Sequence, residues 1–124
     1  MPYEISFDQK DNIVIARVFG MATHDEHHSA QEEAFILCNE KNCSGILVDL
    51  HDLDTAKSDS VTCFDSGEFV AKAPIPLATR IAHVMPANQK SRKNVEFVLT
   101  VAANRGRYSG QFKTFEEAKN WLLH

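Results

Sequence analysis

The run Gly45-Ile46-Leu47-Val48-Asp49-Leu50 constrains the fold of this chain more than any other segment. Apolar side chains occupy consecutive positions in it, so an extended strand here carries apolar side chains on both of its faces. A strand of that kind is usually central in a sheet and is buried by helices on at least one side. The run therefore predicts an α/β domain with residues 45–50 in the middle of its sheet.

Other strand-like segments precede and follow this run. Apolar and polar residues alternate over 3–8, which predicts a strand with one solvated face. The polar break at 8–12 and the β-branched run at 13–19 predict that the second strand pairs back as a hairpin. Residues 79–85 and 107–112 are expected to form two further strands, the last of them at an edge of the sheet.

Capping and helix-breaking residues predict four helices. Thr23 with Glu26, and Thr114 with Glu117, are capping-box pairs that begin the first and the last helix. Gly106 supplies the left-handed residue that ends the third helix. The expected helices are 24–41, a second one that begins at Ser58 or Ser60 and runs to about Lys72, 88–104 and 115–123. Core-facing positions are expected at Phe115, Ala118 and Leu122 in the last helix and at Val95, Val98, Leu99 and Ala102, widened by Phe97 and Val101, in the third.

The predicted order of elements is β-β-α-β-α-β-α-β-α in a single domain over residues 1–124. A chain of this length buries about two thirds of its unfolded surface, which is enough for one core. A hairpin followed by alternating helices and strands makes a mixed sheet, with the later strands parallel and the crossovers right-handed.

Charge and hydropathy argue against two classes of function. The net charge is −4 with both signs interspersed, whereas nucleic-acid-binding proteins usually show a basic face, so no nucleic-acid partner is expected. No apolar run approaches the roughly 20 residues of a membrane span. The N-terminal residues lack the pattern of a signal peptide, so a cytoplasmic protein is expected. A homodimer is a further expectation for so small a domain with surplus apolar residues.

Three cysteines, Cys38, Cys43 and Cys63, make an odd count and predict reduced thiols. The spacing of Cys38 and Cys43 is not the two-residue gap of a zinc knuckle. Neither a metal nor a cofactor is therefore expected.

Taken in order, these segments resemble the SpoIIAA-like proteins, small bacterial domains related to the STAS and Sec14-type folds. The resemblance covers nearly the whole chain and is strongest in its tail. It is carried by Ile46-Leu47-Val48-Asp49-Leu50, Arg80-Ile81-Ala82-His83-Val84, Asn104-Arg105-Gly106, Phe112, and Glu116-Glu117-Ala118-x-x-Trp121-Leu122. It implies the fold described above far more than any activity.

STAS relatives that antagonise anti-sigma factors carry an Asp-Ser-Ser-Gly-like signature, whose Ser is phosphorylated by a partner kinase. Here Asp59-Ser60-Val61-Thr62 stands near that place without the second Ser and the Gly, and Asp65-Ser66-Gly67 falls inside the predicted second helix. A protein-interaction switch with a protein partner is thus the alternative function that the resemblance implies. Its candidate phosphate acceptors are Ser58, Ser60 and Ser66.

Two polar clusters are candidate sites of chemistry. His24 and His28 lie four residues apart, as metal ligands on a helix can, but two ligands are too few for a structural zinc site. With His27 they are expected to form a solvated helix start. Asp49, His51, Asp52 and Asp54 follow the central strand, where ligands bind in α/β sheets. No Gly-x-Ser-x-Gly elbow accompanies them, so a capped polar loop and a non-enzymatic role are expected.

The second helix has more apolar residues than one face needs, and this surplus predicts core packing, a contact surface or a pocket. Basic residues in the first turn of the third helix oppose its dipole, and an anion there would offset the cost. The Sec14-like side of the resemblance also suggests small apolar ligands. The leading hypothesis is therefore a domain that binds a small apolar ligand or lipid in a cavity between the second and third helices and the sheet. The expected ligand-binding residues are Phe64, Phe69, Val70, Lys90 and Arg92.

Overall fold

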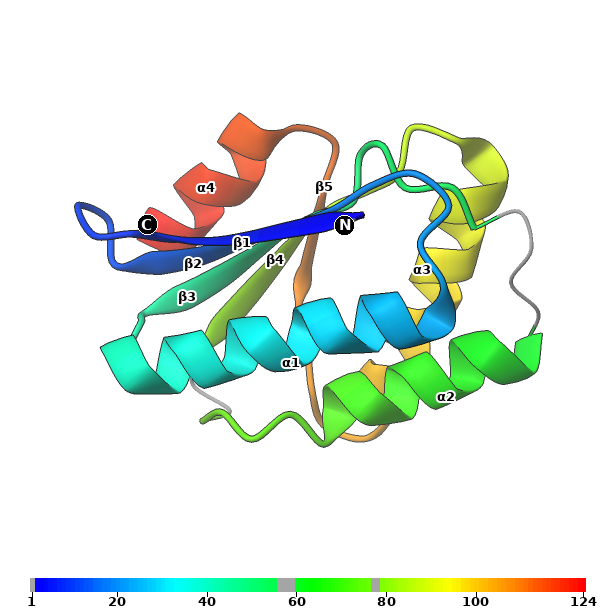
Figure 1. The fold of residues 1–124 in the computed structure, drawn as a ribbon, viewed down its shortest axis with the longest axis horizontal. Coiled ribbons are helices and arrows are strands. Elements are labelled where there is room, and N and C mark those ends of the chain that lie inside the picture. The colour runs from blue at the N-terminus through cyan, green and yellow to red at the C-terminus, as the bar shows by residue number, and fades with distance from the viewer. Residues whose placement is uncertain (1, 56–59, 77–78) are drawn as a thin grey trace.

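The computed structural model describes residues 2–55, 60–76 and 79–124, and for residues 60–62 it describes the backbone alone. Within these ranges the chain forms five strands and four helices (Figure 1). The elements are β1 (Tyr3–Asp8), β2 (Ile13–Val18), α1 (His24–Lys41), β3 (Gly45–Asp49), α2 (Ser60–Ala71), β4 (Arg80–Val84), α3 (Gln89–Asn104), β5 (Gly110–Phe112) and α4 (Phe115–Leu123).

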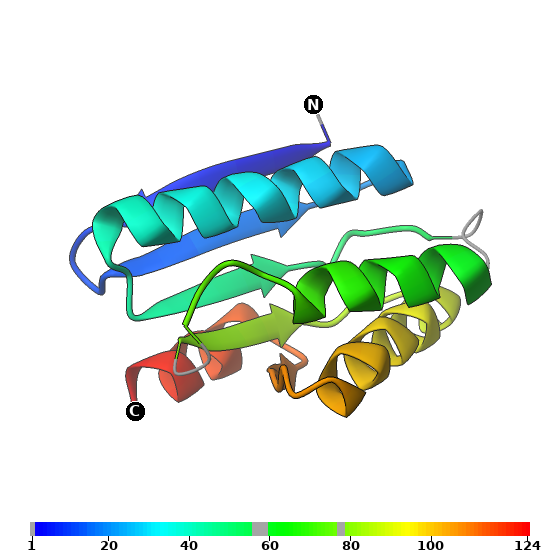
Figure 2. The ribbon, with the colours of Figure 1, turned by 90° about the horizontal axis from the view of Figure 1, so that it is seen from below.

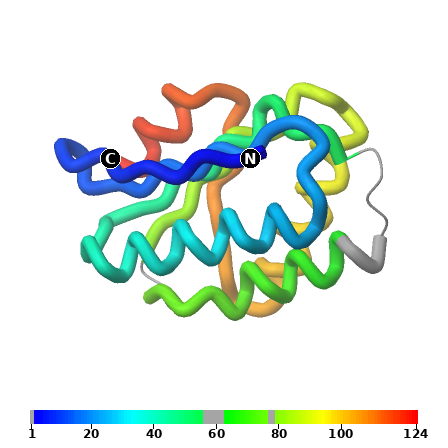
Figure 3. The backbone as a smooth tube through the Cα atoms, in the orientation of Figure 1, coloured from blue at the N-terminus to red at the C-terminus, as the bar shows by residue number. Residues whose placement is uncertain are grey.

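The strands form one mixed sheet in the order β1-β2-β3-β4-β5, so the prediction of an α/β fold with a central third strand is confirmed. β1 and β2 are antiparallel, and each later neighbouring pair is parallel. α1 and α2 cover one face of the sheet and α4 covers the other, while α3 packs chiefly against α2 at one end (Figures 1 and 2). Figure 3 shows the chain returning from the end of α3 as β5 and then turning into α4.

The core lies on both faces of the sheet, as the apolar run of β3 predicted. Ile46 and Val48 belong to the core under α1 and α2. Leu47 points the other way and packs with Ala118 and Leu122 of α4. The alternation of side chains along one strand therefore joins two apolar layers.

The predicted helix caps are confirmed. The Glu26 backbone N–H donates to Thr23 Oγ1 over 3.2 Å, and the Thr23 N–H donates to Glu26 Oε1 over 2.9 Å. Gly106 follows α3 with φ of 93°, in the left-handed region. Such caps depend on residues within a few positions of one another, which explains why the sequence predicts them well.

The predictions for three positions near the C-terminus were wrong. β5 covers only Gly110–Phe112, because Arg107 turns inward and its guanidinium donates to the carbonyls of Ile75 (2.9 Å) and Pro76 (3.2 Å). Phe115 and Phe97 are 36% and 40% exposed instead of being buried in the core, and Ala118 and Leu122 are the residues of α4 that pack in the core layer beneath it.

The prediction of reduced thiols was wrong for two cysteines, because Cys38 and Cys43 form a disulfide. Asn42 adopts left-handed backbone (φ 51°) and reverses the chain at the end of α1. This reversal places Cys43 against the last turn of the helix, where its N–H donates to the Cys38 carbonyl over 3.0 Å. Cys63 lies outside this disulfide and is buried in α2.

Candidate functional site

A groove of about 840 Å³ lies at the carboxyl ends of β4 and β5, between the first turns of α3 and α4. Its lining residues come from the segments after β3, β4 and β5 and from the two helices: His51, Met85, Pro86, Ala87, Arg92, Glu96, Gln111, Phe112, Lys113 and Glu117. Ligands of α/β proteins usually bind at this edge of the sheet.

Main-chain hydrogen bonds hold the floor of the groove. The Met85 N–H donates to the Phe112 carbonyl over 2.8 Å, and the Ala87 N–H donates to the His51 carbonyl over 3.1 Å. The first bond extends the pairing of β4 with β5 by one residue, and the second joins the segments that follow β3 and β4. On the α4 side, the Phe112 ring packs against Trp121, with 5.5 Å between ring centroids. The floor is thus a rigid, mainly apolar surface.

The rim of the groove is charged. Arg92 lies in the first turn of α3, which has no acidic side chain, whereas the first turns of α1 and α4 do. The positive end of the α3 dipole and Arg92 therefore have the same sign. Lys113 and His51 add basic groups, and Glu96 and Glu117 add two carboxylates. The basic side chains of the rim can therefore hold an anionic group, while the apolar floor contacts the rest of the ligand.

His51 belongs to a solvated network of hydrogen-bonded polar side chains, in line with the polar loop predicted here. Its Nδ1 lies 3.0 Å from Asp52 Oδ1, and Arg17 donates to Asp52 Oδ2 over 3.0 Å. The hydrogen bond from His51, and then that from Arg17, hold the pKa of Asp52 below its usual value. All three side chains are about half exposed, so this network is screened by water.

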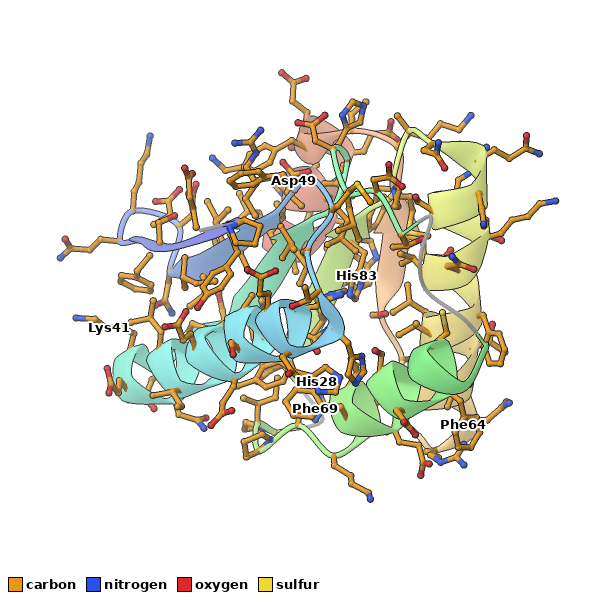
Figure 4. All side chains as sticks on the ribbon, turned by 45° about the vertical axis from the view of Figure 1, so that its right-hand side comes forward. His28, Lys41, Asp49, Phe64, Phe69 and His83 are labelled. Carbon is orange, nitrogen blue, oxygen red and sulfur yellow. A yellow bond between two sulfur atoms is a disulfide. The ribbon has the colours of Figure 1, made fainter. Side chains whose placement is uncertain are left out.

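The structure does not bring the five predicted ligand-binding residues together. Phe64 is 38% exposed, with the Arg105 guanidinium 5.1 Å from its ring centroid. Phe69 lies on the opposite side of α2, next to His28 (Figure 4). Val70 is buried in the core, and Lys90 is exposed at the start of α3. Of the five, Arg92 lines the groove.

The cavities that the described residues enclose beneath α2 are small. One of about 30 Å³ lies against Ser66 and Cys63, and another of about 10 Å³ lies against Val70. A water molecule needs roughly 10–15 Å³ on this scale, whereas ligand pockets usually measure about 300–1,000 Å³. These cavities have room for water, and the groove has the size of a ligand site.

The histidines at the start of α1 are half-buried, so the prediction of a solvated helix start was wrong. α2 packs over the first turns of α1, and His28 stacks on Phe69 with 4.2 Å between ring centroids. The Nε2 atom of His27 is buried, and burial lowers the pKa of this histidine to about 4, with smaller contributions from His28 and His24. The periodicity of α1 could not reveal this packing, because it depends on where α2 lies. In the described part of the chain, no three His, Cys, Asp or Glu side chains are grouped as metal ligands would be.

The predicted phosphate acceptors differ in what the structure says of them. Ser66 is 6% exposed, and its Oγ lies 3.3 Å from His24 Nδ1. Ser58 lies outside the described residues, as does the side chain of Ser60. A kinase could reach Ser66 only after α2 had moved.

Sequence reasoning missed most of the groove. The sequence indicated Phe112 only as the end of a strand and Glu117 only as part of a helix cap, and it gave Lys113 no role. A signal was nonetheless present, because these residues follow strand ends or begin helices at the edge where parallel strands terminate.

Comparisons with protein-family models, with curated proteins and with solved structures found no match. The architecture alone therefore defines the class of this protein, an α/β domain with a five-stranded mixed sheet over the described residues. Within the described ranges, no helix has both the length and the apolar content needed to cross a bilayer.

Proposed function

We propose that this domain is a non-enzymatic binding module whose ligand is a small amphipathic anion held in the groove at the carboxyl ends of β4 and β5. The ligand would be an organic carboxylate or phosphate with an apolar portion. The observation that carries the proposal is a groove of about 840 Å³ with an apolar floor and basic groups at its rim.

The size and position of the groove support this proposal. Its volume falls within the usual range of small-molecule sites, and it lies at the edge of the sheet where such sites form. The cavities beneath α2 are more than tenfold smaller, so the groove replaces the space beneath α2 as the place for the ligand.

The chemistry of the lining supports an amphipathic ligand over a purely apolar one. Met85, Pro86 and Phe112 offer apolar contact, while Arg92 and Lys113 offer charge-assisted hydrogen bonds to an anionic group. Glu96 and Glu117 would repel a second anionic group, so a single charged end is favoured.

The proposal predicts selective binding of singly headed anions. Octanoate and phenyl phosphate, with 1-octanol and phenol as uncharged comparators, would be titrated by isothermal calorimetry and by thermal shift. The anionic probes should bind and raise the melting temperature, and the uncharged ones should not. Backbone amide shifts at Phe112 and Lys113 in NMR spectra would locate the bound probe.

Charge reversal at Arg92 gives the sharpest version of this test. Arg92→Glu should weaken binding of the anionic probe at least about tenfold, equivalent to about 1.4 kcal/mol. Lys93→Glu is the matched control, because Lys93 shares the same helical turn but does not line the groove. Equal affinity for charged and uncharged probes, or an Arg92→Glu variant that binds like the parent protein, would refute an anion site in the groove.

The alternative, a switch controlled by phosphorylation, has less support from the described residues. The burial of Ser66 against His24 and His28 leaves its hydroxyl inaccessible in this conformation. Phosphorylation of Ser58 or Ser60 remains a prediction.

A further inference from the structure

Four imidazoles gather where α1, α2 and the sheet meet. We name His24, His27 and His28 of α1 and His83 of β4 the histidine cluster, and Ser66 of α2 lies against it. Figure 4 shows His83 on the sheet and His28 beside Phe69 of α2. The groove and its ligand do not involve any of these side chains.

The histidine cluster makes much of the contact between α2 and α1. Ser66 Oγ lies 3.3 Å from His24 Nδ1 and 3.5 Å from His28 Nε2. The ring of His28 lies between those of His24 and Phe69, at centroid distances of 4.0 and 4.2 Å. The Ser66 hydroxyl can donate to one of these ring nitrogens and accept from the other.

Two members of the histidine cluster are poorly placed to carry charge. Among the described residues, His27 Nε2 and His83 Nδ1 are buried without a hydrogen-bond partner. The small cavity beside His27 is lined by uncharged groups of α2 and α3, among them Ser66, Asn94 and the Cys63 thiol. A proton on either ring would therefore be a buried charge with no counter-ion.

The charged and titratable neighbours do not offset this penalty. His24 and His28 lower the pKa of His27 further, and His27 lowers the pKa of His83. Asp25 of α1 and Asp65 of α2 favour the charged form of His28 alone. A backbone hydrogen bond with Gly110 favours the charged form of His83, against a larger cost of burial.

We propose that the histidine cluster is an acid-sensitive latch, in which protonation of His27 and His83 releases α2 from α1 and the sheet while the sheet and α4 remain folded. The second core layer, which joins Leu47 to Ala118 and Leu122, lies on the opposite face of the sheet and does not touch the latch. Release would expose apolar side chains of α2 that pack toward the core, Phe69 and Val70 among them.

The direction of the pH effect follows from linkage. Burial lowers the pKa of His27 and of His83 to about 4, whereas both rings titrate near 6.5 once exposed. The open form therefore binds more protons between about pH 6.5 and 4, and the closed form loses stability as the pH falls through this window. Well above pH 6.5 neither form binds a proton on these rings, so the two histidines no longer favour opening.

The reactivity of Cys63 measures the opening of α2. This thiol is buried in α2 and lines the cavity beside His27, and 4,4′-dithiodipyridine reacts with thiols even in mild acid. Its labelling rate, corrected for the intrinsic reactivity of a model thiol, should rise at least about tenfold between pH 7 and 5. Trp121, the only tryptophan in the sequence, reports on α4 and should keep its emission spectrum over the same range.

Substitutions then assign the effect to the histidine cluster. His27→Gln with His83→Gln should abolish the rise in Cys63 labelling, and His124→Gln, an exposed histidine at the end of α4, should not. If the double variant does not fold, hydrogen exchange on the parent protein tests whether α2 opens separately from the sheet. At pH 5, peptides from α2 should lose protection while those from β3 and β4 keep it. If Cys63 labelling and Trp121 emission change with the same pH midpoint, the whole domain unfolds and the latch is overturned. It is overturned as well if the folded double variant still shows the rise in Cys63 labelling in acid.

Discussion

At the scale of single residues, Arg107 shows how a charged side chain can be structural. Its side chain is 3% exposed and donates to the carbonyls of Ile75 and Pro76, which joins the segment after α3 to the segment after α2. Burial lowers the pKa of its guanidinium. The sequence pattern placed Arg107 at the start of a predicted strand and gave no sign of the distant carbonyls.

Replacing Arg107 should therefore be costly. Arg107→Met keeps most of the apolar volume but removes the guanidinium donor from the buried Ile75 carbonyl, whereas the Pro76 carbonyl still accepts from the Thr79 N–H. We therefore expect a loss of about 1–3 kcal/mol in the free energy of unfolding. Urea denaturation followed by circular dichroism would measure it. Arg17→Met removes an exposed ion pair with Asp52 and should cost under about 1 kcal/mol. Equal losses in the two variants would contradict a structural role specific to Arg107.

At the scale of elements, the crossing of α2 and α3 depends on Gly67. A Cβ atom at this position would lie 2.5 Å from Val101 Cβ and 2.7 Å from the Val98 carbonyl oxygen. The absence of a side chain lets the two helices approach closely, so a residue that interrupts the apolar stripe of α2 in the sequence is required by its partner helix.

Gly67→Ala tests this close approach. Alanine favours a helix by about 1 kcal/mol over glycine, but overpacking should outweigh that gain and leave the variant about 1–3 kcal/mol less stable. In a double-mutant cycle measured by thermal unfolding, Val101→Ala should recover part of the loss, because it removes the Val101 Cγ1 atom that would lie 2.7 Å from the added Cβ, while Val101 Cβ stays in place. Strictly additive effects would show that the Val101 methyl groups do not limit the space at residue 67.

The disulfide between Cys38 and Cys43 acts at the junction of α1 and β3. Closing so short a loop stabilises a fold by about 2 kcal/mol on the chain-entropy estimate. Adding a phosphine reductant should therefore lower the urea midpoint of the parent protein. The variant carrying Cys38→Ser and Cys43→Ser should be less stable by a similar amount and should not respond to the reductant. If the reductant does not change the urea midpoint of the parent protein either, the disulfide does not contribute this stability.

At the scale of the whole molecule, the sheet separates two regions with different chemistry. The face under α1 and α2 carries the larger apolar core and the histidine cluster. The groove opens at the edge where β4 and β5 end, between α3 and α4. A ligand in the groove and a proton on the histidine cluster would thus act on different elements, and the experiments proposed for each can succeed or fail separately.

The sequence by itself determined the elements and their order. The apolar run of β3, the alternation in β1 and the capping pair of Thr23 and Glu26 each involve residues close together along the chain, so local patterns predict them. The mixed sheet followed from that order through the general rules of strand connection.

Only the tertiary structure decided what those elements bury and enclose. His27 lies in the expected helix, yet its Nε2 atom is buried where α2 packs over that helix. Phe64 and Phe69 share a helix but face different surroundings. The groove joins His51, Arg92 and Lys113 from three separate parts of the chain. Such features depend on the packing of segments distant in sequence, and hydrophobic periodicity within one segment carries no information about its neighbours in space.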